Sequence, residues 1–200
     1  MQPNIDIDKG FFDKETIREM LLNRLPKGGY GIEVGVFRGE FSEVILEITE
    51  PELLVLIDPW EVTEDDKQYY LCHNKGRVWD EKAEDHIRGM NYFKYDLVQK
   101  KFKDNPKVRI IREKAEDAVK LLIPNMFDFV YIDGDHFDAY NDIVNYYPLL
   151  KEGGYMCGDD YKKEWFDTTV IEDVDRFVKE RGLKLQIISN QWIIRKQCNQ

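Results

Sequence analysis

The stretch FDFVYIDGDHFDAYNDIVNYYPLLKEGGYMCGDDY, residues 127–161, decides the fold of this chain. It begins with a β-rich run over 127–133, continues with a helical pattern over 136–150 and ends with a short β-rich run over 154–158. Nearly continuous apolar runs of this kind are typical of strands that are covered on both faces, as in a parallel sheet. The stretch therefore predicts a strand–helix–strand unit with parallel strands.

The same alternation of strands and helices extends over most of the chain. Towards the N-terminus we expect three more strands, at 30–37, 53–58 and 108–112. We expect further helices at 39–49, 91–104, 114–123 and 168–181, and an amphipathic helix at 13–25 within an N-terminal helical segment of about 10–27. This order predicts a doubly wound α/β fold.

The C-terminal end departs from this alternation. The runs over 183–189 and 191–195 are separated by too little chain for a crossover helix, so they must pair antiparallel as a hairpin. With the five strands before it, the hairpin completes a seven-stranded sheet. We predict one domain over 1–200, because this length suits a single domain and no linker interrupts it.

The composition excludes several classes of partner. The chain has 29 basic and 39 acidic residues, a formal net charge of −10, whereas nucleic acids and anionic membranes require clustered Lys and Arg. No apolar run approaches the ~20 residues of a membrane span, and the N-terminus lacks the pattern of a signal peptide. Cys72, Cys157 and Cys198 show no CxxC spacing, which indicates reduced thiols. We expect a cytoplasmic protein without nucleic-acid or membrane partners.

One connection is longer than a crossover needs. About fifty residues separate Asp58 from Val108, roughly twice what a helix and two loops require. The surplus, about 60–90, is aromatic and charged, and it follows a strand at the edge where α/β proteins bind ligands. We interpret it as a lid or acceptor-binding insertion, whose Trp60, Tyr69, Tyr70 and Trp79 could stack on a sugar or aromatic ring. The alternative is a surface excursion that covers the sheet edge.

A glycine turn follows the first strand. Glu33, Gly35 and Gly39 form an ExGxxxG pattern, in which glycines let the backbone approach a ligand closely. The spacing is not the GxGxxG of dinucleotide-binding proteins. The Glu33 carboxylate could hold a cationic amino group; the alternative is a solvated charge at the strand end.

An acidic residue also ends the second strand. Asp58 lies 23 positions after Gly35, a distance at which an acid can accept hydrogen bonds from ribose hydroxyls. The alternative is that Asp58 caps a helix.

The strongest pattern lies at the ends of the fourth and fifth strands. Asp133, Asp135 and His136 follow one strand, and Asp159 and Asp160 follow the other. Because neighbouring parallel strands end at one rim, these carboxylates would repel one another unless a cation or hydrogen-bond donors offset the charge. Oxygen ligands of this type suit Mg²⁺, Mn²⁺ or Ca²⁺. Alternatively, Asp135 caps the helix over 136–150 and Asp159 binds backbone amides.

Taken together, these residues resemble the class I S-adenosylmethionine-dependent methyltransferases. The resemblance rests on the glycine turn, the acid that ends strand two, the Ile-Asp-Gly-Asp-His segment at 132–136 and the closing hairpin, and it covers roughly 28–196. Within that superfamily, 131–161 is similar to the macrocin-type (family 24) small-molecule and sugar O-methyltransferases. The resemblance implies a Rossmann-like sheet, and methyl transfer to the hydroxyl of a small acceptor such as a sugar.

The resemblance also implies roles for individual residues. The metal-dependent members bind Mg²⁺ (or Mn²⁺) at positions that correspond to Asp133, Asp159 and Asp160. The sugar-modifying members use as base the acid that corresponds to Asp135, and caffeoyl-CoA-type relatives have a lysine where this chain has His136, so the base is Asp135 or His136. The cofactor would be bound by Glu33, Gly35 and Gly39 at its methionine end, by Asp58 at its ribose, and by Lys114, Ala115 and Glu116 at its adenine. Asp133 would be a further cofactor-binding residue.

Two other functions remain open at this point. A nicotinamide-dependent oxidoreductase could use the same fold type, although the missing GxGxxG and the hairpin argue against it. A ligand-binding module without activity is the second, and the acidic cluster argues against it because an idle cluster would only add repulsion. The composition leaves a homodimer open.

Overall fold

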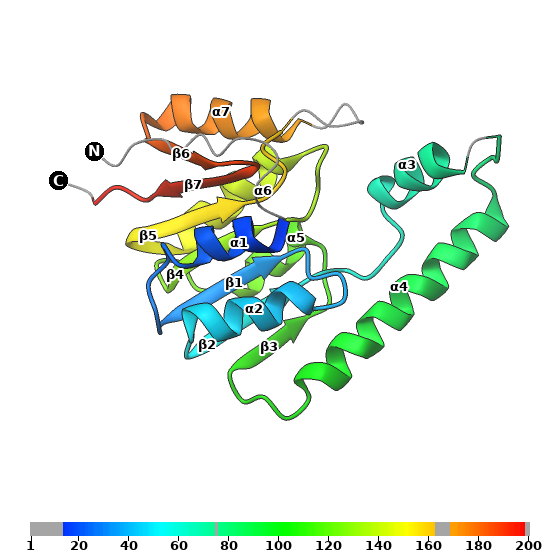
Figure 1. Ribbon diagram of the computed structural model, residues 1–200, viewed down its shortest axis with the longest axis horizontal. Coiled ribbons are helices and arrows are strands. Elements are labelled where there is room, and N and C mark those ends of the chain that lie inside the picture. The colour runs from blue at the N-terminus through cyan, green and yellow to red at the C-terminus, as the bar shows by residue number, and fades with distance from the viewer. Residues whose placement is uncertain (1–13, 75, 163–168, 199–200) are drawn as a thin grey trace.

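A seven-stranded mixed sheet runs through the part of the chain that the computed structural model describes, residues 14–74, 76–162 and 169–198. The strand order is β3-β2-β1-β4-β5-β7-β6 (Figure 1). Strands β1 to β5 pair in parallel, and β7 pairs antiparallel with β5 and β6, so the predicted fold class and hairpin are confirmed. The strands are β1 (Tyr30–Val34), β2 (Leu53–Ile57), β3 (Val108–Ile111), β4 (Phe127–Ile132), β5 (Leu150–Gly158), β6 (Leu185–Ile188) and β7 (Gln191–Arg195).

Helices cover both faces of the sheet. In Figure 1, α1 and α2 lie in front of the sheet, and α5 and α6 lie behind it. No helix in the described ranges is long and apolar enough to cross a lipid bilayer. The helices are α1 (Lys14–Leu22), α2 (Glu40–Thr49), α3 (Glu64–His73), α4 (Glu81–Phe102), α5 (Ala115–Ala118), α6 (Ala139–Tyr146) and α7 (Val170–Arg181), with two 3-10 turns, η1 (Val119–Leu121) and η2 (Tyr147–Leu149).

The helix predicted over 114–123 is the short α5 followed by the turn η1, and the next predicted helix is also shorter than expected. The helix expected over 136–150 begins at Ala139 and ends at Tyr146, because Pro148 has no amide hydrogen for a helix interior and instead lies in the turn η2. The chain then enters β5 at Leu150, earlier than predicted. The starts expected for the N-terminal segment, at about 10, and for the helix over 168–181 lie outside the described residues.

The buried side chains form one core on each face of the sheet. Alternate residues of β2 show the division: Val55 and Ile57 belong to one cluster, whereas Leu54 and Leu56 belong to the other. This is the pattern of a strand that is covered on both sides. The second cluster includes residues of α1, α2 and α4, so α1 is anchored against the sheet.

The 60–90 insertion contains the helix α3 and the N-terminal half of the long helix α4. Instead of a loop followed by a helix over 91–104, α4 runs without interruption for 22 residues, and its N-terminal half belongs to the 60–90 segment. Figure 1 shows α3 and this half of α4 projecting beyond the sheet. Trp60 does not belong to an exposed lid, because it is only 3% exposed and its indole Nε1 donates a hydrogen bond to the Phe37 carbonyl (2.8 Å). That residue is therefore not available to stack on an acceptor.

Candidate active site

The carboxyl ends of β1, β4 and β5 meet at one edge, where the last residues of the strands pair in register. Gly35, Asp133 and Asp159 follow these strands, so they come together as the sequence predicts. The approach is closest at Gly35, which has φ +88° and whose Cβ, if present, would lie 2.0 Å from the Asp133 carbonyl oxygen. Only glycine fits here, so the glycine turn packs directly on the loop after β4.

Glu33 is buried at this edge. The residue is only 1% exposed, and its Oε2 atom accepts a hydrogen bond from the Ser42 hydroxyl (2.5 Å). Burial raises the pKa of Glu33 to about 8, although the Ser42 bond opposes the shift. Glu33 is therefore not the solvated strand-end charge that the sequence left open. Gly39 lies nearby as the N-cap residue of α2, with φ +75°.

Asp58 holds the glycine turn in place. Its Oδ2 accepts hydrogen bonds from the amides of Val36 (3.0 Å) and Phe37 (2.9 Å), and its Oδ1 accepts one from the amide of Trp60 (2.7 Å). Burial raises the pKa of Asp58, and these amide bonds partly offset the shift. Asp58 does not cap α3, because Thr63 fills that position. That Asp58 contacts the cofactor ribose stays a prediction. Such a contact would be a second role of Asp58, besides its support of the turn.

The residues expected at the adenine lie further along the same edge. Lys114 is the N-cap residue of the short helix α5, Ala115 begins it and Glu116 follows. They come after β3, which is separated from β4 by β2 and β1. The Ala115 carbonyl accepts a hydrogen bond from the Tyr146 hydroxyl of α6 (3.0 Å), which ties this corner to the helix layer behind the sheet.

An arginine from α1 lies between the carboxylates that end β4 and β5. The Nη2 atom of Arg18 is 2.5 Å from Oδ2 of both Asp133 and Asp159, and its Nε is 3.1 Å from the same Asp159 oxygen. Burial disfavours the charged form of Arg18, but the two carboxylates outweigh it, and the pKa of Arg18 rises above its usual value. The like-charge repulsion expected between these acids is thus offset by a side chain of the protein itself.

Asp159 is enclosed by hydrogen-bond donors. Its Oδ1 accepts bonds from the side-chain amides of Asn190 and Gln191 and from the amide of Asp160 (2.7 Å). Tyr131, which is fully buried, donates its hydroxyl to Gln191 Oε1 (2.7 Å). The amide of Asp160 is a backbone donor of the kind that the alternative for Asp159 expects, and the side-chain amides of Asn190 and Gln191 add to it. The predicted metal set of Asp133, Asp159 and Asp160 does not fit these contacts, because the Asp159 side chain is wholly buried among its donors.

His136 and Asp160 form a pair beside these residues. The His136 Nε2 atom lies 2.8 Å from Asp160 Oδ2 and 3.9 Å from Asp133 Oδ1. Among the described residues, Asp133, His136 and Asp160 are the group whose potential ligand atoms all lie within 4.8 Å of one another. An imidazole oriented by a carboxylate is the geometry of a general base.

Asp135 lies at the start of the turn that leads into α6. Its Oδ1 accepts hydrogen bonds from the amides of Phe137 (2.8 Å) and Asp138 (3.1 Å), and the residue is exposed. The N-cap position of α6 belongs to Asp138, not to Asp135 as the sequence suggested. The side chain therefore stabilises the turn before the helix.

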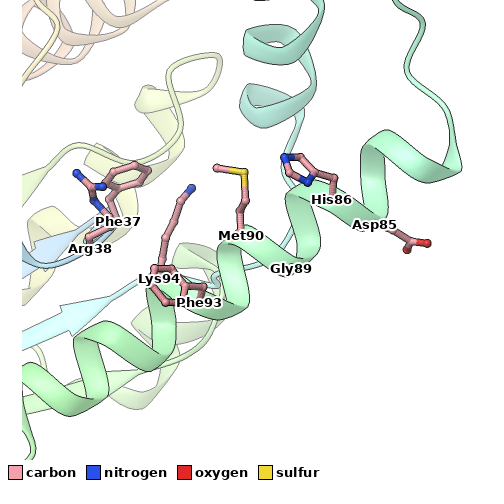
Figure 2. Close-up of a pocket in the computed structure, with 8 residues that line it drawn as sticks. All are labelled: Phe37, Arg38, Asp85, His86, Gly89, Met90, Phe93 and Lys94. Atoms are coloured by element: carbon pink, nitrogen blue, oxygen red, sulfur yellow. The ribbon is translucent and has the colours of Figure 1, made fainter.

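A groove of about 560 Å³ opens between the glycine turn and α4. Its walls are Phe37 and Arg38 on one side and Met90, Phe93 and Lys94 on the other, and Figure 2 shows Met90 and Lys94 projecting from α4 beside Phe37. The Lys94 Nζ atom is 4.2 Å from the centre of the Phe37 ring. Burial lowers the pKa of Lys94. The groove thus joins the projecting part of α4 to the predicted cofactor edge.

The comparison with known families identifies the fold and the class. Residues 32–161, more than half of the chain, match the model of a family described as a methyltransferase domain. The chain belongs to this methyltransferase-domain family. The resemblance inferred from the sequence is thereby confirmed.

Individual relatives of this methyltransferase are distant. An uncharacterized protein of Acanthamoeba polyphaga mimivirus is 22% identical over 153 residues, which are 74% of this chain and 59% of that protein. A Methanococcus maripaludis structure described as a candidate S-adenosylmethionine-dependent methyltransferase has a TM-score of 0.57 at 17% identity, covering 92% of this chain and 84% of the other. The O-methyltransferase NovP has a TM-score of 0.55 at 21% identity, covering 92% and 79%. At these identities the structural likeness shows the fold.

Sequence reasoning missed several residues near the sheet edge at which β1, β4 and β5 end. Arg18 is the most consequential, and the signal for it was weak: a single arginine on a helix face with Ile17, Leu21 and Leu22. Asp142 was also missed, although its position among the buried residues of α6 follows the helical period. Asp142 is only 6% exposed, its Oδ2 has no hydrogen-bond partner within the described ranges, and burial raises its pKa to about 7.

Proposed function

We propose that this methyltransferase transfers the methyl group of S-adenosylmethionine to a hydroxyl group of a small acceptor such as a sugar. The observation that carries the proposal is the His136–Asp160 pair, which lies beside the glycine turn and the buried Glu33 at one sheet edge. An acceptor hydroxyl must lose its proton, and this pair is a base with its orienting partner.

The residues at the edge suit this cofactor. Gly35 leaves space where any side chain would collide with the Asp133 backbone, so the turn can approach a ligand closely. Each Asp58 oxygen has two lone pairs, so the carboxylate can accept a ribose hydroxyl in addition to its amide bonds. When bound, the sulfonium of the cofactor supplies an electrophilic methyl group.

The protein itself must orient the acceptor and remove its proton. The new bond forms between the acceptor oxygen and the methyl carbon while the carbon–sulfur bond breaks, and the hydroxyl proton passes to the base. We assign the base to His136, because the Asp160 carboxylate lies 2.8 Å from its Nε2 atom and orients the imidazole. Asp135 is the alternative, but its Oδ1 already stabilises a turn. This proton transfer involves no metal ion, because the predicted set of Asp133, Asp159 and Asp160 does not fit one.

Calorimetry and turnover test this function directly. We expect S-adenosylhomocysteine, the demethylated product, to bind with one-to-one stoichiometry, and NADH not to bind. Incubation with methyl-labelled cofactor and a panel of sugars, phenols and carboxylates should label a hydroxyl compound. Binding of NADH instead of the methyl-transfer product would favour the nicotinamide-dependent alternative.

Removal of the Asp58 side chain should weaken product binding. We expect Asp58→Ala to cost about 1–3 kcal/mol in the affinity for S-adenosylhomocysteine, because a ribose hydroxyl loses its acceptor. The variant also leaves three amides without their acceptor, so the loss has two sources. A 2′,3′-dideoxy product analogue separates them: a ribose contact predicts a smaller loss with the analogue. Glu47→Ala, an exposed charge on α2, is the control. Equal affinity in folded Asp58→Ala and wild type would remove Asp58 from the site.

We also propose that α4 forms one wall of the acceptor site, and the groove beside Phe37 supports this proposal. Phe93→Ala should raise the acceptor KM about 5- to 10-fold, the loss expected when an aromatic contact of ~1 kcal/mol disappears. The matched control is Tyr92→Ala on the same helix, which is 64% exposed and outside the groove. Product affinity should stay the same in both variants. If Phe93→Ala weakens product binding and leaves KM unchanged, the groove belongs to the cofactor.

A further inference from the structure

The acidic edge contains a cation supplied by the chain itself. Arg18 donates to Asp133 and Asp159 at the same time, and its side chain is only 15% exposed. Its guanidinium carbon also lies 4.5 Å from the centre of the Phe41 ring, which is a favourable cation–π position. Two ion pairs and one cation–π contact therefore hold one positive charge between the two carboxylates.

The packing of α1 fixes this charge in place. Ile17, Leu21 and Leu22 are buried against the sheet, and Leu25 extends the same apolar face. Arg18 lies one turn before Leu22, so the anchored helix delivers its side chain over the sheet edge. The family match begins only at residue 32, so Arg18 belongs to a segment outside it.

The contacts of Asp133 and Asp159 leave little for a metal ion. Asp159 already accepts bonds on both oxygens, and its side chain has no exposed surface. Asp133 has its Oδ2 on the guanidinium, while its Oδ1 faces His136. A divalent cation bound to Asp133 would be close to the positive charge of Arg18, and like charges at this range repel strongly in a partly buried site.

We propose that Arg18 is a positioning residue that takes the place of a divalent cation at this edge, holding Asp133 and Asp159 so that methyl transfer proceeds without a metal bound to Asp133. The proposal has a binding half, that Arg18 excludes a metal from Asp133, and a catalytic half, that methyl transfer proceeds without that metal. Only the catalytic half rests on the proposed function. The exclusion of metal can be measured by binding alone.

Mn²⁺ is the probe for the binding half, because free and bound Mn²⁺ differ in their electron paramagnetic resonance spectra. We expect no bound Mn²⁺ in the wild type when protein and metal are each at about 100 µM. This concentration is on the order of the dissociation constant that separates specific sites from weak ones. Arg18→Gln removes the charge but keeps hydrogen-bond donors, and it should bind Mn²⁺ at least tenfold more tightly through Asp133, His136 and Asp160. Arg18→Lys keeps the charge and should behave as the wild type.

The controls separate this effect from a general change in charge or folding. Arg24→Gln removes a positive charge just after α1, where the side chain donates to Gln186, and it should not alter Mn²⁺ binding. If Arg18→Gln fails to fold, the double variant with Asp159→Asn removes the charge together with its most buried partner and should show the same gain. Tight Mn²⁺ binding by the wild type would overturn the proposal, and so would a folded Arg18→Gln or double variant that binds no better than wild type.

The catalytic half is tested on the wild type with a divalent chelator. Turnover should be unchanged by exhaustive EDTA treatment and by added Mg²⁺. Loss of turnover that Mg²⁺ restores would overturn the proposal while leaving methyl transfer established. If S-adenosylhomocysteine does not bind at all, the proposed function fails, and the Mn²⁺ measurement still decides the role of Arg18.

Discussion

Replacement of His136 by glutamine should lower kcat about 10²- to 10⁴-fold, the usual loss when a general base is removed. The cause is the loss of an imidazole that a carboxylate orients, since Asp160 lies 2.8 Å from His136. The affinity for S-adenosylhomocysteine should stay near the wild-type value, because the base acts on the acceptor. Single-turnover methyl transfer and product calorimetry measure the two quantities separately.

Asp135→Asn is the matched control for this experiment. Asparagine keeps the oxygen that accepts the amides of Phe137 and Asp138, so the turn is preserved while the charge is lost. We expect it to retain most of the wild-type kcat. The pH–rate profile adds a second readout, because the limb that reports the ionisation of the base should disappear in the variant that lacks the base. An inactive Asp135→Asn together with an active His136→Gln would reverse the assignment.

The sequence was sufficient to predict the sheet and the meeting of its acidic ends. The strands were identifiable because they are apolar on both faces, as Leu54 and Val55 show by facing different cores. The neighbourhood of Asp133 and Asp159 then followed from parallel pairing alone, since parallel strands end at one edge. These conclusions require only local pattern and topology.

The partners of those acids could not be predicted in the same way. Arg18 is 115 positions from Asp133 and 141 from Asp159, and its placement depends on how α1 docks on the sheet. Asn190 lies in the turn of the hairpin, where a polar residue is expected without any buried partner. The sequence showed that the acidic charge needs compensation, but it did not show that the compensation comes from donors of the protein.

The long helix α4 was missed for a different reason. Its N-terminal half is polar on most sides, because it projects beyond the sheet and has little core to face. A segment without an apolar stripe has no helical period to detect. By contrast, Val98 and Phe102 in the other half are buried against the sheet, and that half was predicted correctly as helix.

Glu33→Gln should stabilise the protein at alkaline pH and have little effect in acid. The pKa of Glu33 is about 8 in the folded state, against 4.5 for the free side chain, because burial disfavours the carboxylate. As the pH rises above about 4.5, the unfolded chain loses this proton while the folded chain keeps it, so the free energy of unfolding falls until about pH 8 and then levels off. The whole shift corresponds to on the order of 3–5 kcal/mol.

Urea unfolding at pH 4, 6, 8 and 9 measures this dependence as the difference between the variant and the wild type. Glutamine keeps an oxygen that can accept the Ser42 hydroxyl, so its advantage should grow with pH through the range in which only the unfolded chain is ionised. Comparing differences removes the contribution of Asp142, whose pKa of about 7 gives a slope of the same sign in both proteins. Glu47→Gln, on the exposed face of α2, should show no such growth. A constant difference between Glu33→Gln and wild type across this range would mean that Glu33 is ionised in the folded protein, held in that state by Arg18, whose charge lies close enough to lower its pKa.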